Sequence, residues 1–204
     1  MEYRYEKDSM GEIAVPVDAL WGAQTQRSLR NFSIGNERIP LSIIYAITLI
    51  KKSCAKASSV LSPRKMTSKK LDGITYACDA ILNKELDEQF PLSVWQTGSG
   101  TQTNMNVNEV IANFANKKLG EKLLHPNDDV NMSQSTNDVF PTSIHVSGVM
   151  NIEDNLIPSC KLLISVLKDL QRKNQGVKTG EISREYRNIK YCIRSLNIIH
   201  YFVE

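Results

Sequence analysis

The feature that most constrains the fold is an apolar stripe that begins near Leu41 and recurs every three or four residues. Such spacing places the apolar side chains on one face of a helix. Pro63 ends the pattern, because a proline inside a helix removes a backbone hydrogen bond and clashes with the preceding turn. The stripe consists of Ile43, Ile44, Ile47, Ile50, Cys54, Ala57 and Leu61. The chain therefore contains a long amphipathic helix that needs apolar partners.

Similar patterns recur further along the chain and predict more helices. Residues 67–85 repeat the spacing, and residues 107–118 outline another helix that ends at Gly120. Residues 144–170 predict long helical segments that restart near Pro158. Before the first long stripe, residues 1–40 carry turn signals and short extended runs, with one short helix over residues 23–31.

These patterns predict a mainly α protein in three parts. Residues 1–138 form a helical N-terminal domain with short β and turn elements. Residues 139–178 form the start of a helical bundle, whose apolar stripe needs partner helices. Residues 179–204 form a tail that continues neither pattern.

Composition excludes several classes of protein. The chain has 204 residues, of which 41% are hydrophobic and 23% charged, as expected of a soluble globular protein with one ordinary core. The net charge is only +3 and the basic residues are scattered, which argues against nucleic acid binding. No stretch reaches the roughly 18 apolar residues of a membrane span, and the N-terminal residues resemble neither a signal nor a transit peptide. We therefore expect a cytoplasmic protein.

The four cysteines lie far apart and form no CxxC pair. This spacing is not that of a disulfide-rich secreted protein, and instead favours reduced, buried thiols. The cysteines are Cys54, Cys78, Cys160 and Cys192.

Residues 95–106 are rich in Gly, Ser, Thr and Asn, which predicts a loop rather than a helix. Within it, Gly98 and Gly100 let the backbone approach a ligand closely, and the hydroxyls of Ser99 and Thr101 suit a carboxylate or a phosphate. The lysine that follows the second glycine of a P-loop is absent. A plain glycine-rich turn before a helix, capped by Asn104 or Asn106, remains the alternative.

A second polar stretch runs over residues 125–138. Its acidic side chains and His125 are possible metal ligands, but a metal would need further ligands in a defined geometry. Asx turns and a cap on the next helix explain Asn127, Asp128 and Asn137 without a metal. We expect His145 to pack in the apolar face of the following helix, and we assign no role to His200.

Taken together, four spaced blocks resemble the class II (iron-independent) fumarate hydratases of the fumarase/aspartase superfamily. The blocks cover residues 6–11, residues 20–28, residues 89–92 with 95–106, and residues 125–129 with 133–142. The resemblance implies reversible trans addition of water to fumarate to give L-malate, without a metal or an organic cofactor. It also implies a homotetramer in which each active site draws residues from three subunits.

Site residues follow from the resemblance, position by position. The family's substrate-contacting positions correspond to Ser99, Thr101, Asn104, Ser135, Thr136 and Asn137. Its secondary dicarboxylate site corresponds to Lys122, His125, Asn127 and Asp128. The family commonly has Arg at the position of Lys122, so the loss of a planar bidentate contact predicts weaker binding there. A second Ser is more common than Thr136, but the hydroxyl is kept.

The chain departs from the family near its end. A Gly-Arg-Thr-His block, whose histidine activates water, is replaced after Val177 by residues 178–184 of different sequence. The mobile Gly-Ser-Ser loop with the proposed base, and the Lys and Asn donors that follow it, are also missing. We therefore expect a truncated or frameshifted chain that carries binding residues, lacks the catalytic base and is inactive alone.

Two alternatives to this function remain. An aspartase-like ammonia lyase is disfavoured because aspartases usually carry Ala at the position of Ser99. An inactive fragment would at most associate with full-length subunits.

Overall fold

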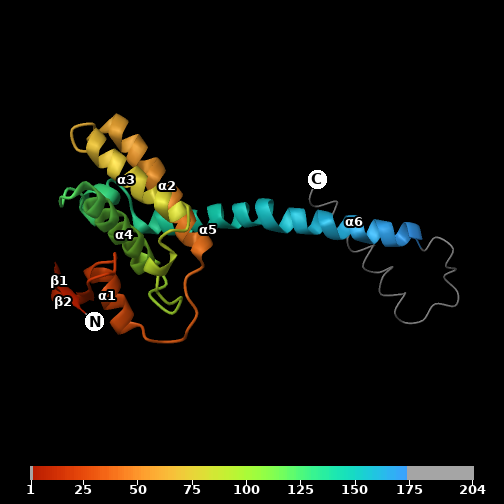
Figure 1. Cartoon of the computed structure of the whole chain (residues 1–204), viewed down its shortest axis with the longest axis horizontal. Coiled ribbons are helices and arrows are strands. Elements are labelled where there is room, and N and C mark those ends of the chain that lie inside the picture. The colour runs from red at the N-terminus through yellow and green to blue at the C-terminus, as the bar shows by residue number, and fades with distance from the viewer. Residues whose placement is uncertain (1, 174–204) are drawn as a thin grey trace. The chain divides into compact units, whose positions relative to one another are not determined.

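The computed structural model describes residues 2–173, in which a short β-hairpin precedes six α-helices (Figure 1). The strands are β1 (Tyr3–Asp8) and β2 (Gly11–Pro16), and the helices are α1 (Ala23–Asn31), α2 (Leu41–Leu61), α3 (Ser68–Leu82), α4 (Thr101–Leu119), α5 (Thr136–Asn151) and α6 (Ile157–Lys173). Three single turns complete the list: η1 (Asp87–Gln89), η2 (Pro126–Val130) and η3 (Ile152–Leu156). The predicted mainly α class is confirmed. The predicted tail, with Cys192 and His200, lies outside the described residues.

The hairpin confirms the short extended runs predicted near the N-terminus. Its strands pair antiparallel, with Tyr3 opposite Pro16 and Asp8 opposite Gly11. Gly11 turns the chain at φ +107°, a conformation that suits glycine. Ile13 and Val15 point to one face and pack in a small cluster with Ala19 and Ala23 at the start of α1. The hairpin and α1 therefore form one substructure.

The main core lies between α2, α3 and α4, which run side by side (Figure 1). Its fully buried side chains include Ile47 of α2, Ile74 and Ile81 of α3, and Ile111 of α4. Each such side chain stabilises the fold by roughly 1.5–3 kcal/mol relative to exposure. The helix predicted from Leu41 is confirmed, and its end before Pro63 follows from the missing amide hydrogen of proline.

The chain divides into two compact units, of which the first spans Met1–Ser147 and contains every predicted site residue. The second begins at Gly148. There, the π-helical turn η3 precedes α6, in agreement with the predicted restart near Pro158. No residue of α6 is buried, and Leu162, Leu163, Val166 and Leu170 are all exposed.

The prediction of a loop over residues 95–106 is wrong at its C-terminal end, because α4 begins at Thr101. Gly100 is the N-cap, in the left-handed conformation at φ +69°, so neither Asn104 nor Asn106 caps the helix. Both asparagines are buried inside it, and Asn106 Nδ2 donates to the carbonyl oxygen of Gln89 at 3.1 Å. Tertiary partners therefore make this polar stretch compatible with a helix.

Other local predictions also need correction. Asn137 lies in the first turn of α5 rather than at its cap, and its amide donates to Ser135 Oγ at 3.3 Å. His145 is exposed, because it lies on the face of α5 opposite to the buried Ser143 and Ser147. Among the described cysteines only Cys78 is buried. Cys160 lies on the exposed helix α6, and Cys54 lies at the border of the buried face of α2.

Candidate functional site

The turn at residues 98–101, which leads into α4, is fixed against α5 by a glycine. A Cβ atom at Gly100 would overlap the ring of Phe140, and the positive φ disfavours any other residue. This close approach places the turn before α4 next to the first turns of α5. Ser99 and Thr101 flank the glycine, with their hydroxyl oxygens 3.0 Å apart, and both side chains are exposed. The turn thus presents two adjacent hydroxyls to solvent.

Asn104, in the first turn of α4, joins this turn to the predicted site residues Ser135, Thr136 and Asn137. Its side chain is buried, and its Nδ2 donates to Thr136 Oγ1 at 3.0 Å and to Asn131 Oδ1 at 3.2 Å. Thr136 begins α5, while Ser135 and Asn137 on either side of it are exposed. Two blocks that are about thirty residues apart in the sequence therefore meet through a side-chain hydrogen bond.

These six predicted residues carry only hydroxyl and amide groups. Such groups donate and accept hydrogen bonds but do not accept a proton near neutral pH. The cluster can therefore bind a carboxylate and orient it. Proton transfer has to come from side chains outside these six.

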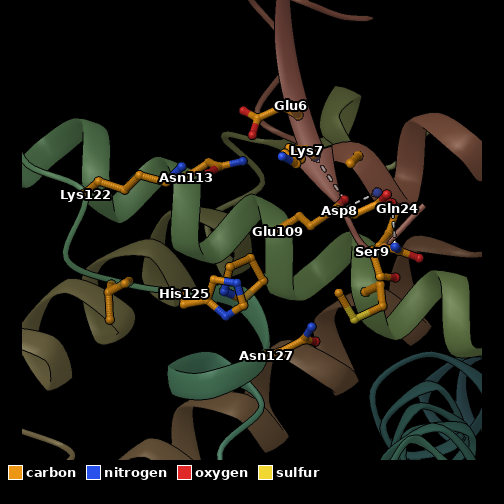
Figure 2. Close-up of a pocket in the computed structure, with 15 residues that line it drawn as sticks. Glu6, Lys7, Asp8, Ser9, Gln24, Glu109, Asn113, Lys122, His125 and Asn127 are labelled. Atoms are coloured by element: carbon orange, nitrogen blue, oxygen red, sulfur yellow. Dashed lines mark hydrogen bonds between the residues drawn. The ribbon is translucent and has the colours of Figure 1, made fainter. Parts of the chain in front are cut away.

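A second site lies between the hairpin, the middle of α4 and residues 122–127, in a cavity of about 330 Å³ (Figure 2). Residues from β1, the start of α1, α4, the segment that follows α4, and η2 line it, including Lys7, Asn113, Lys122, His125 and Asn127. Three of the four residues predicted for the secondary site are thus together. The fourth, Asp128, is exposed and lies outside the lining, with its Oδ2 3.2 Å from His125 Nδ1.

The carboxylates that line this cavity are all engaged with other parts of the chain. Asp8 forms two hydrogen bonds of 2.9 Å with the Arg27 guanidinium, which holds the pKa of Asp8 below its usual value. Glu6 pairs with Arg4 at 2.9 Å, and Glu109 accepts hydrogen bonds from the start of α1. Arginines therefore compensate the charges of Glu6 and Asp8, whereas the Glu109 carboxylate is held by neutral donors alone.

The lysines that line the cavity, unlike its carboxylates, lack partners within the chain's described part. Neither Lys7 nor Lys122 has an ionic or hydrogen-bonding partner among residues 2–173. Two unpaired lysines thus stand against one carboxylate without a cationic partner, Glu109, and this positive balance suits an anion. Sequence reasoning missed Lys7 as a site residue, although it lies in the block at residues 6–11 that carried the resemblance.

The buried Asp129 and the partly buried Asn116 hold the backbone around His125. Asp129 accepts from the amide of His125 at 2.8 Å through Oδ2 and pairs through Oδ1 with Lys70 Nζ of α3 at 2.6 Å. On the other side, Asn116 Oδ1 accepts from the amides of Leu123 and Leu124. The segment that carries Lys122 and His125 is thereby tied to both α3 and α4.

Within residues 2–173 no group of three or more His, Cys, Asp and Glu side chains could hold a metal ion. The helices of the same part of the chain are too short or too polar to cross a membrane.

A family model described as lyase matches residues 11–180. The chain belongs to the lyase family. Over 181 residues this lyase chain is 51% identical to the class II fumarate hydratase of Staphylococcus aureus, an alignment that covers 87% of the chain and 39% of that relative. The class II fumarate hydratase of Oceanobacillus iheyensis shows the same identity and coverage. The predicted resemblance to class II fumarate hydratases is confirmed.

Solved structures agree with this family. The class II fumarase of Schistosoma mansoni superposes with a TM-score of 0.81 at 41% identity, covering 84% of the lyase chain and 37% of that protein. A fumarate lyase:delta crystallin from Brucella melitensis gives a TM-score of 0.87 at 35% identity, covering 96% and 48% respectively. The lyase chain thus spans less than half the length of each of these proteins.

Proposed function

We propose that the chain forms part of a fumarate hydratase, which interconverts fumarate and L-malate, and supplies part of its dicarboxylate site. The hydrogen bond between Asn104 and Thr136 carries this proposal, because it gathers two blocks of neutral donors into one cluster. The names of the relatives support the substrate. In this proposal Ser99, Thr101, Asn104, Ser135, Thr136 and Asn137 bind one carboxylate of fumarate.

The chemistry explains why such donors are needed. Hydration adds the hydroxyl of water to C2 of fumarate and a proton to C3. In the reverse direction, loss of the C3 proton leaves an electron pair that delocalises into the adjacent carboxylate. Hydrogen-bond donors aimed at that carboxylate stabilise the extra charge. Neutral donors can do so without themselves taking the proton.

Titration of the chain with fumarate, followed by NMR of backbone amides, tests the proposal. We expect shifts centred on residues 99–104 and 135–137. Thr101→Val should weaken binding about tenfold, the loss of roughly one good hydrogen bond to a charged group. Ser53→Ala, on the exposed side of α2, serves as the control and should bind like the unchanged chain. Absence of shifts, or equal binding by Thr101→Val, would contradict the proposal.

A rate assay tests the division between binding and catalysis. The absorbance of fumarate should stay constant when the chain is incubated with it alone, since the six binding residues cannot transfer protons. Turnover close to that of a complete fumarate hydratase would show that the chain needs no further residues.

The cavity beside the hairpin is proposed as a secondary dicarboxylate site. Lys122, His125 and Asn127 line it, and we add Lys7 because its charge is also uncompensated. Asp128 contributes through its contact with His125 rather than from the lining. The positive charge of the two lysines supports a dianion as the ligand.

Assembly into a homotetramer is the remaining part of the proposal, with a cytoplasmic enzyme of the tricarboxylic acid cycle as its setting. The exposed apolar residues of α6 support association with other copies of the chain. Made alone, the chain should associate non-natively and show low solubility. A monodisperse monomer that melts cooperatively, seen by sedimentation and thermal unfolding, would contradict this.

A further inference from the structure

Lys51 is an unusual residue for the middle of α2, since its side chain has an exposed fraction of 0%. Its Nζ donates to Asn131 Oδ1 at 2.6 Å and to Gln134 Oε1 at 2.9 Å. Among the described residues these two amide oxygens are its only acceptors. Both belong to the segment directly before α5.

Asn131 connects this lysine to the candidate site. Its Oδ1 also accepts from Asn104 Nδ2 at 3.2 Å and from Asn108 Nδ2 at 3.4 Å, both in α4. Asn104 in turn donates to Thr136. One oxygen atom thus links α2, α4 and the segment that leads into α5.

Gln134 holds the same segment from its other end. Its Nε2 donates to the carbonyl oxygens of Val130 at 3.0 Å and Met132 at 3.4 Å, while Oε1 accepts from Lys51. Within the same segment, Asn131 Nδ2 donates a hydrogen bond to the carbonyl oxygen of Gln134 at 3.2 Å. Lys51 therefore closes a ring of hydrogen bonds over residues 130–134.

The burial of Lys51 does not by itself stabilise the folded chain. Removing an ammonium group from water costs several kcal/mol, and an apolar side chain of similar volume is often as stable or more so. Burial lowers the pKa of Lys51 to about 7, while the neighbouring thiols of Cys54 and Cys78 have raised pKa values. A neutral amine has two N–H groups, which match the two acceptors. The geometry is therefore suited to holding a loop in place.

We propose that Lys51 is a positioning residue, which fixes residues 131–134 so that the Thr136 hydroxyl faces Asn104 in the dicarboxylate site. Lys51 does not touch the substrate, because its side chain is fully buried. Its effect on binding rests on the proposed function, but its effect on the loop does not.

Lys51→Met in the full chain tests the proposal, with Lys52→Met as the matched control on the same helix. Lys52 pairs with Asp79 at the surface and makes no contact with residues 131–134 in the described structure. Hydrogen exchange is read by mass spectrometry. In Lys51→Met the amides of residues 130–138 should exchange at least about tenfold faster, with exchange in α2 and α3 unchanged. Fumarate affinity should fall at least about tenfold. Lys52→Met should change neither.

Several results would overturn the proposal. Unchanged exchange over residues 130–138 shows that the lysine does not hold the loop. Faster exchange throughout α2 and α3 shows a purely structural role. If Lys51→Met does not fold, Gln134→Ala is compared with Gln134→Glu, since both remove the Nε2 donor but only Gln134→Ala removes the acceptor of Lys51. Gln134→Ala should then show the larger localised change, and equal exchange in the two variants would contradict the role of Lys51. If the unchanged chain binds no fumarate, the proposed function fails, and the exchange result alone decides the role of Lys51.

Discussion

The carboxylate of Glu109 accepts a hydrogen bond of 2.9 Å from the backbone amide of Gly22, which lies 87 residues earlier in the chain. It also accepts from the amides of Gln24 and Thr25 and from the Thr25 hydroxyl. An acid of α4 thus caps α1, which has no side-chain cap of its own. Burial raises the pKa of Glu109, and these donors offset part of that rise.

Glu109→Gln should lower the free energy of unfolding by about 2–4 kcal/mol, because the new amide group faces backbone N–H donors that need an acceptor. Urea denaturation measures the change. Glu12→Gln, at an exposed position of β2, is the control and should stay within about 0.5 kcal/mol. A Glu109→Gln chain as stable as this control would show that the cap contributes little.

Gly100→Ala should destabilise the chain by about 2 kcal/mol or more, since the positive φ and the overlap with Phe140 act together. Gly98→Ala is the control, because a Cβ there would have nothing within 4 Å. Thermal unfolding compares the two variants. Titration with fumarate, followed by NMR, should show weaker binding in Gly100→Ala only. Equal melting temperatures would rule out the proposed contact with α5.

Stability should depend on pH through Lys51. Its pKa of about 7 in the folded chain lies below the ordinary value of 10.5, so the unfolded chain binds more protons above pH 7. Stability should therefore rise with pH and be lost as the pH falls through 7. Between pH 7 and 9 the unchanged chain should gain about 2 kcal/mol relative to Lys51→Met.

The rise of stability with pH is limited at high pH by the titration of a buried thiol, Cys78. Burial raises the pKa of Cys78 to about 12, so above its ordinary value of 9.0 the unfolded chain releases a proton that the folded chain keeps. Stability then falls with rising pH.

Urea denaturation compares the free energy of unfolding of the unchanged chain with that of Lys51→Met. A difference between the two chains that stays constant from pH 7 to 9 would contradict the titration of Lys51.

Replacement of the cavity lysines should weaken binding of L-malate at the second site. Lys7→Gln and Lys122→Gln should each reduce affinity several-fold, while Lys122→Arg should increase it because a guanidinium contacts a carboxylate through two parallel hydrogen bonds. NMR shifts of the His125 ring during malate titration report this site. Lys117→Gln, at an exposed position of α4, is the control. Identical titration curves for all variants would exclude the cavity as an anion site.

Local periodicity predicted the fold well where packing follows from apolar spacing. The helix from Leu41 and its end before Pro63 needed no tertiary information. The start of α4 could not be predicted in this way. Residues 101–106 form a helix because Asn104 and Asn106 find partners on other segments, at Thr136 and Gln89. No local pattern contains those contacts.

The candidate site shows the same division. The polar blocks were visible in the sequence because glycine, hydroxyl and amide residues cluster there. Their connection through Lys51 and Asn131 was not, since a lysine within an amphipathic stripe normally faces water. Lys7 was missed for a related reason. Its importance depends on Asp8 and Glu6 being engaged elsewhere, which only the folded chain reveals.

No residue of α6 is buried, although isoleucine, leucine and valine recur along the helix. An isolated helix of this length is marginal in water. If contacts with other copies supply the missing stabilisation, folding of this segment and association are one equilibrium. Its helical content would then increase with protein concentration, as that of a leucine-zipper peptide does, whereas the helices of the first unit would be formed at any dilution.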